Sequence, residues 1–217
     1  MKKVVFFAFL FLFLCVNNVS ATPLQVDVKH RSSTEGSIYF EDYDGGWHTF
    51  YTDYYLSTDL YGDVEAFCVE GSTSGPDGLT YYQMAVPDNL TDAAWVADQY
   101  WTNPGFGLTT KEKAQIIIWE LAIDTVFDFS TGDFRYAGVQ EAWLTNFYND
   151  NIAGSIGTLG PDISLVYNPG PTYDTPTVHQ DFLIDEPVPE PTTMLLFGFG
   201  ALGMAALGRK RRLNRKE

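Results

Sequence analysis

The chain is poor in cysteine, in histidine and in basic residues. Its 217 residues include two cysteines, three histidines and 13 lysines or arginines, against 28 aspartates and glutamates. The histidines show no metal-ligand spacing, and HExxH, P-loop and G-x-S-x-G motifs are absent from the sequence. These absences argue against a zinc enzyme, a nucleotide-binding enzyme and a serine hydrolase. We therefore expect a protein that is not an enzyme and that holds no metal or cofactor.

The shortage of basic residues is greatest in the middle of the chain. Residues 22–191 carry 27 acidic side chains and five basic ones. Such a surface repels nucleic acid and anionic membranes, so we expect no nucleic-acid partner. The acidic groups within residues 41–44 and 59–63 do not fit the EF-hand pattern, and we interpret them as solvated turns. Aromatic residues make up 16% of the chain, which excludes a disordered protein.

The first 21 residues predict a secretory signal peptide. Lys2 and Lys3 precede an apolar run over residues 4–16, and Val19-Ser20-Ala21 forms a small-residue cleavage site. The alternative, a retained membrane anchor, is disfavoured because this run is too short to span a bilayer. Cys15 lies within the signal and would leave with it. Cys68 is then the single cysteine of the exported protein, without an intramolecular disulfide partner.

The last thirty residues combine a proline-rich linker, an apolar segment and a basic tail. Residues 192–208 are apolar and glycine-rich, and as a helix they would span about 26 Å, which suits a transmembrane segment. The alternative, a solvated amphipathic tail, is disfavoured because the segment has no polar face. The positive-inside rule places the tail, residues 209–217, in the cytoplasm. Its stop-transfer residues are Arg209, Lys210, Arg211 and Arg212.

The C-terminal order resembles the PEP-CTERM sorting signal of Gram-negative bacteria that make exopolysaccharide. The resemblance rests on Val188, Pro189, Glu190 and Pro191 within the linker 185–191, followed by the apolar segment and the basic tail. It implies recognition, and cleavage near this motif, by an exosortase, a membrane transpeptidase-like protease. It also implies anchoring in the inner membrane before processing, and then a place at the cell surface or in the extracellular matrix.

The middle of the chain predicts an α+β fold. Alternating apolar residues and turn signals predict strands over residues 25–29, 37–40, 48–55, 64–69, 79–86, 163–167 and 178–184. Helical periodicity predicts helices over residues 91–101, from a capping box at Thr109–Glu112 onward, and over 139–149. The second helix is apolar nearly all round, so we expect it to be buried. The pattern is typical of a β-rich exported domain, residues 22–184, with a central bundle of about three helices.

One constellation joins Cys68 to the second helix. Cys68 lies between Phe67 and Val69 at the end of a predicted strand, and the helix carries Gln115 one turn before Trp119. A buried amide side chain needs partners, because an unsatisfied one costs roughly 1–3 kcal/mol. Gln115, on an otherwise apolar helix, therefore needs a polar partner when it is buried.

These two segments resemble the thioester domain of bacterial surface adhesins. In that family an aromatic-Cys-aliphatic motif supplies a thiol, and a Thr-Gln-x-Ala-aliphatic-Trp motif supplies a carboxamide. The resemblance implies that Cys68 attacks Gln115, that ammonia leaves, and that a surface or matrix amine later opens the internal thioester. Phe67 and Trp119 would pack around the bond. The motif threonine and alanine are replaced here by an alanine and an isoleucine.

Other interpretations stay open. Cys68 can be a small buried hydrophobe and Gln115 a hydrogen-bonded helix residue. A Cys68 nucleophile with His48 or His179 as its base has no local support in the sequence. A third interpretation is a non-covalent exopolysaccharide- or matrix-binding structural protein that uses exposed aromatic side chains, namely Trp47, Tyr51, Tyr54 and Tyr55.

Overall fold

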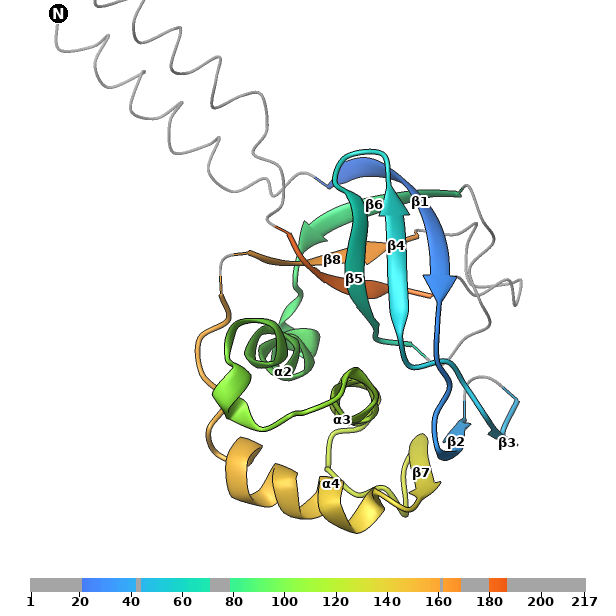
Figure 1. Ribbon diagram of the computed structural model, residues 1–217, viewed down its shortest axis with the longest axis vertical. Helices are drawn as coiled ribbons and strands as arrows, with labels where there is room; N and C mark the ends of the chain where they lie inside the picture. The colour runs from blue at the N-terminus through green and yellow to red at the C-terminus, as the bar shows by residue number, and fades with distance from the viewer. Residues whose placement is uncertain (1–20, 42–43, 71–78, 161, 169–179, 187–217) are drawn as a thin grey trace, which may run out of the picture.

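A closed antiparallel barrel forms one end of the molecule (Figure 1). The computed structural model describes residues 21–41, 44–70, 79–160, 162–168 and 180–186. Around the barrel the strand order is β1-β4-β5-β9-β8-β6. The bounds are β1 Thr22–His30, β4 Tyr54–Thr58, β5 Gly62–Cys68, β6 Leu79–Ala85, β8 Ile163–Tyr167 and β9 Phe182–Asp185.

The long first strand closes the barrel. The first half of β1, up to Val26, pairs with β6, and the second half, from Val26 onward, pairs with β4. One continuous strand therefore belongs to two ladders, and no edge is left between them. Alternation places Tyr54, Leu56 and Thr58 of β4 on the buried face, with less buried residues between them.

Two of the three helices lie against one end of the barrel, and the third lies beyond them, away from the barrel (Figure 1). Helices α2 (Thr91–Thr102) and α3 (Lys111–Ile123) pack on each other and contact β9 and β5, respectively. Helix α4 (Glu141–Phe147) continues into a π turn, η3 (Tyr148–Ile152), and contacts the small sheet. Short 3₁₀ turns, η1 (Asp88–Leu90) and η2 (Pro104–Phe106), precede and follow α2. In the described residues no helix is long and apolar enough to cross a membrane.

A small sheet covers the side of α3 that faces away from the barrel. It has the order β3-β2-β7, with β2 Gly36–Phe40, β3 Trp47–His48 and β7 Phe134–Gly138. Phe40 and Phe134 pack their rings on Trp119 of α3, at centroid distances of 5.3 and 5.9 Å. Helix α3 is thus covered on both sides, and the expectation of a buried helix is confirmed: Ala114, Ile116, Ile117, Ile118 and Trp119 are all 0% exposed.

The α+β class and the three helices agree with the sequence, whereas several boundaries were predicted wrongly. The expected strand over residues 48–55 is not continuous: β3 ends at His48, and β4 begins at Tyr54. Between them the chain leaves the small sheet for the barrel. Here it pairs with residues 31–34 through an isolated bridge between Ser33 and Tyr51, and the Arg31 N–H donates to the Asp53 carbonyl oxygen at 3.0 Å. β9 begins at Phe182, so residues 180–181 of the expected last strand are irregular, while residues 178–179 lie outside the described residues.

The helix starts also differ from expectation. The N-cap of α3 is Thr110 rather than Thr109, and its hydroxyl accepts from Lys113 N at 3.4 Å. The expected capping box is wrong because the Glu112 carboxylate accepts from Glu35 N at 2.7 Å instead. The third helix begins at Glu141 rather than at residue 139. Residues 134–138 form strand β7 against β2, which the sequence did not predict.

Candidate functional site

Cys68 and Gln115 meet where the end of β5 lies against α3. Both side chains are 0% exposed. Cys68 N–H donates to Gln115 Oε1 at 2.9 Å, and Gln115 Nε2 donates to the Cys68 carbonyl oxygen at 2.6 Å. The β4–β5 ladder ends at the Tyr54–Ala66 pair, so β4 does not pair with Cys68. The Gln115 carboxamide instead makes the two hydrogen bonds that a neighbouring strand would make to the Cys68 N–H and carbonyl oxygen.

The thiol of Cys68 is held in a neutral, buried state. Its Sγ donates to the carbonyl oxygen of Glu70 at 2.8 Å. Burial raises the pKa of the thiol far above its ordinary value, and the negative charges of Glu70 and Asp181 raise it further. A hydrogen bond with the Glu70 backbone and one with the indole of Trp119 oppose this rise of the thiol pKa only in part. A thiolate at this position would have to form together with proton transfer, rather than exist beforehand.

Two buried polar groups beside Cys68 lack conventional hydrogen-bond partners. They are the indole Nε1 of Trp119 and the hydroxyl of Tyr81, both on side chains that are 0% exposed. The Trp119 N–H faces the thiol, a weak acceptor, and Tyr81 interacts electrostatically with Cys68 and Asp181. An unsatisfied buried polar group costs roughly 1–3 kcal/mol, so the Tyr81 hydroxyl is a costly neighbour of the cysteine, whereas the Trp119 N–H is compensated in part by the sulfur.

The structure separates the two side chains that were expected to pack around the thiol. Trp119 lies beside it, as the sequence motif suggested. Phe67 lies on the opposite face of the strand and packs on Tyr100 and Trp101 of α2, with ring centroids 5.3 and 4.9 Å apart. Phe67 therefore covers the back of β5 rather than the thiol itself. Tyr81 was missed, because nothing in the sequence of β6 distinguishes it from its tyrosine neighbour.

The other candidate residues have local explanations. His48 Nε2 lies 2.7 Å from Asp44 Oδ1, while His179 lies outside the described residues. Asp59 accepts from Gln25 N, and Asp63 lies 3.3 Å from Lys29 Nζ. Within the part of the chain that the structure describes, no group of three or more histidine, cysteine or acidic side chains could hold a metal ion.

The predicted segments at the two ends lie outside the described residues. These are residues 1–20 of the signal peptide, the motif residues 188–191, the apolar segment 192–208 and the basic residues 209–212. The comparison of the sequence with protein families bears on the last three. Residues 187–212 match the model of the PEP-CTERM protein-sorting motif. The chain carries a PEP-CTERM motif.

The PEP-CTERM motif indicates an exported, extracellular protein that is anchored to the membrane and sorted by an exosortase. It accounts for the C-terminal residues alone and assigns no activity to the exported domain. No curated protein and no solved structure matches the chain. The function of the domain between residues 22 and 184 must therefore be argued from its own side chains.

Proposed function

We propose that the exported domain is a covalent adhesin in which Cys68 and Gln115 form an internal thioester. The observation that carries the proposal is the pair of hydrogen bonds, 2.9 and 2.6 Å, that hold the Gln115 carboxamide against Cys68. A buried carboxamide that is already fixed on the backbone of the attacking cysteine needs little further ordering, and such proximity can lower the reaction barrier by several kcal/mol.

The reaction is an acyl transfer within the protein. Cys68 Sγ forms a bond to the side-chain carbonyl carbon of Gln115, the carbon–nitrogen bond breaks, and the thiol proton leaves with the nitrogen as ammonia. For this the S–H must leave the Glu70 carbonyl, to which it now donates at 2.8 Å. The Trp119 N–H lies on the sulfur side, where it opposes the rise of the thiol pKa and so favours the attack.

The environment also protects the product. Cys68, Gln115 and Trp119 are each 0% exposed, which keeps water away from a hydrolysable bond. The domain has no second cysteine that could draw Cys68 into an intramolecular disulfide. We propose a single use for each thioester, with an amine as the second acyl acceptor, so that the adhesin needs no catalytic turnover and no cofactor.

The acidic surroundings suggest what kind of target opens the bond. The carboxylate of Glu70 acts on the thiol, and Asp181, whose pKa burial raises to about 8, adds a second acidic group that is only partly ionised at neutral pH. A protonated amine, such as a lysine side chain of the matrix or an amino sugar, is attracted to such a site, whereas an anionic polysaccharide is repelled. We propose an extracellular surface or matrix component with free amino groups as the target.

Mass spectrometry of the native exported domain tests the proposal. The intact protein should be lighter than its sequence by one ammonia, and methylamine should add its own mass to it. Cys68→Ala and Gln115→Ala should each remove the deficit. Gln99→Ala, which alters a glutamine on α2, is the control that should keep it. A native protein at full sequence mass that does not react with methylamine would reject the thioester.

A second candidate is non-covalent binding of exopolysaccharide through exposed aromatic rings. Trp47 and Tyr51 are 49% and 47% exposed, which favours this candidate. Tyr54 does not contribute because it is 3% exposed, and Arg31 lies 3.9 Å from the ring centre of Tyr55. Co-sedimentation with exopolysaccharide that survives Cys68→Ala but is lost in Trp47→Ala would support it. Loss in Cys68→Ala alone would contradict it.

A further inference from the structure

A buried lysine lies between two carboxylates at the start of α3. The side chain of Lys111 is 7% exposed, and its Nζ lies 3.4 Å from Asp53 Oδ1 and 3.3 Å from Glu65 Oε1. Nζ also donates to the carbonyl oxygen of Tyr54 at 2.5 Å. The three charged groups come from three separate segments: the residue before β4, strand β5 and the first residue of α3.

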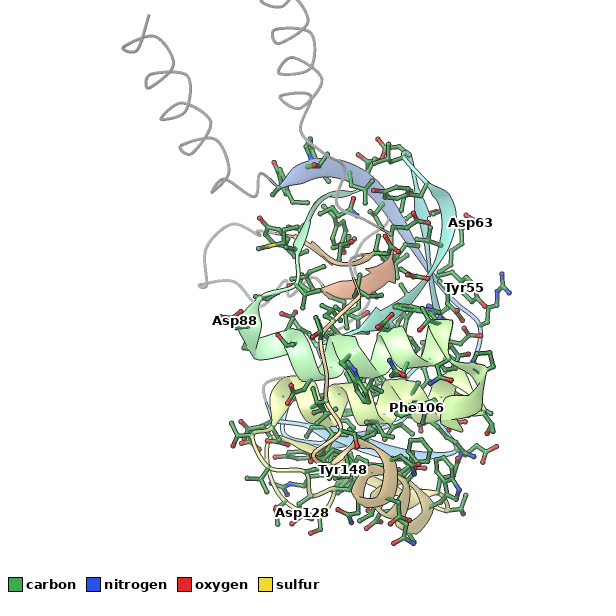
Figure 2. The ribbon with its side chains drawn as sticks, turned by 90° about the vertical axis from the view of Figure 1, so that its left-hand side faces the viewer. Tyr55, Asp63, Asp88, Phe106, Asp128 and Tyr148 are labelled. Carbon is green, nitrogen blue, oxygen red and sulfur yellow. The ribbon has the colours of Figure 1, made fainter. Side chains whose placement is uncertain are left out.

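Aromatic rings enclose this cluster. Lys111 Nζ lies 4.6 Å from the ring centre of Tyr55 and 5.4 Å from that of Phe67. Figure 2 shows Tyr55 at the junction between the barrel and the helices. Burial lowers the pKa of Lys111, and the two carboxylates oppose this only in part. Lys111 in this site is therefore more easily converted to the neutral, nucleophilic amine than a lysine in water.

The two carboxylates are not equivalent. Glu65 Oε2 accepts from the indole Nε1 of Trp101 at 2.9 Å, which stabilises an ionised carboxylate. Asp53 Oδ1 is buried and faces Lys111 Nζ at 3.4 Å. Because the Trp101 indole holds Glu65 in place beside Lys111, we assign Glu65 as the base and Asp53 as the acyl group.

We propose that Lys111 and Asp53 form an intramolecular isopeptide bond, with Glu65 as the proton carrier. Glu65 accepts a proton from Lys111 Nζ and passes it to the Asp53 carboxylate, and the neutral amine attacks the Asp53 carboxyl carbon. Glu65 then accepts a second proton from the nitrogen and passes it to the Asp53 hydroxyl, whose carbon–oxygen bond breaks so that it leaves as water. The ammonium and the carboxylate become one neutral amide and one water, Glu65 ends as it began, and no further reactant is needed.

The bond would tie α3 to the barrel one helical turn before Gln115. Glu65 precedes Cys68 by three residues on β5, so the cross-link lies beside the place where Gln115 contacts Cys68. It would hold the carboxamide in register with the strand against forces that pull on an attached adhesin. The isopeptide bond does not depend on the thioester, because its three groups are separate from Cys68 and Gln115.

The test uses the Cys68→Ala variant of the exported domain, in which no thioester can contribute to the mass. Its denatured mass should be lower than the sequence mass by one water molecule. Chymotrypsin cleaves between residues 53 and 65, so a digest should contain one branched peptide that joins Asp53 to Lys111. Lys111→Arg in the same background should restore the full mass, whereas Lys113→Arg, on the same helix, should keep the deficit.

Two results would overturn the inference. One is a Cys68→Ala protein at full sequence mass whose Lys111 is acetylated in the denatured state. The other is a branched peptide that contains residue 65 in place of residue 53, which would exchange the two assigned roles. Both are measured on protein that retains Lys111, so they decide the question even if the Lys111→Arg variant does not fold.

Discussion

Glu120 predicts an unusual dependence of stability on pH. Its side chain is 1% exposed on α3, and its Oε2 is buried without a hydrogen-bond partner. Its pKa is raised from 4.5 to about 8: burial is the largest cause, the Asp128 N–H, at 2.6 Å from Oε1, opposes the rise, and the carboxylates of Asp124 and Asp128 add to it. Figure 2 shows Asp128 and Tyr148 at the end of the molecule away from the barrel.

The direction of this pH dependence follows from whether the folded or the unfolded protein holds the Glu120 proton. Between pH 4.5 and about 8 the folded protein keeps the Glu120 proton, while the unfolded chain releases it. The free energy of unfolding therefore falls as pH rises through this window, by up to about 1.4 kcal/mol per pH unit and of order 5 kcal/mol in all. The contribution is fully present below pH 4.5 and is lost above about pH 8.

Glu120→Gln isolates this effect, because glutamine keeps the shape and the acceptor for Asp128 N but cannot ionise. In urea titrations at pH 8, the free energy of unfolding of the variant should exceed that of the wild type by several kcal/mol. At pH 5 the two values should be nearly equal. The difference between the two proteins removes the contribution of Asp181, whose pKa is also raised to about 8. Asp88→Asn, at an exposed carboxylate, is the control. Parallel pH profiles for Glu120→Gln and the wild type would refute the reasoning.

Two further predictions concern stability. Thr110→Ala removes the N-cap hydroxyl of α3 and should lower the free energy of unfolding by about 1 kcal/mol, measured by urea titration. Thr109→Ala should leave it nearly unchanged. A larger loss for Thr109→Ala than for Thr110→Ala would show that Thr109 is the N-cap. Phe134→Ala opens a cavity beside Trp119 and should lower the free energy of unfolding by about 3–5 kcal/mol. Val139→Ala, at a side chain that is 84% exposed, is the control and should lower it by less than about 0.5 kcal/mol. Equal thermal shifts for this pair would show that the small sheet does not stabilise α3.

The sequence predicted the kinds of elements better than their arrangement. Strand alternation and helical periodicity are local, so the α+β class, the barrel strands and the burial of α3 could be expected. The closed barrel could not, because it depends on Val26 pairing on both sides of one strand. The capping box failed because a partner distant in the chain, the backbone of Glu35, takes the Glu112 side chain.

The candidate site shows the same limit. The proximity of Cys68 and Gln115 was expected from a family resemblance and not from their spacing, and the structure places them in contact. The thioester itself stays a prediction. The Lys111 cluster escaped sequence analysis because its three charged residues are far apart in the chain and meet only when β4, β5 and α3 pack together.

The thioester is tested most directly by finding the covalent bond between two identified residues. Native exported domain is denatured in acid, digested, and analysed by tandem mass spectrometry. The account predicts one branched peptide in which Cys68 Sγ is joined to the Gln115 side chain, and two separate peptides, with methylamide on Gln115, after treatment with methylamine. Separate peptides from untreated protein, with a free Cys68 thiol and an intact Gln115 carboxamide, would contradict it.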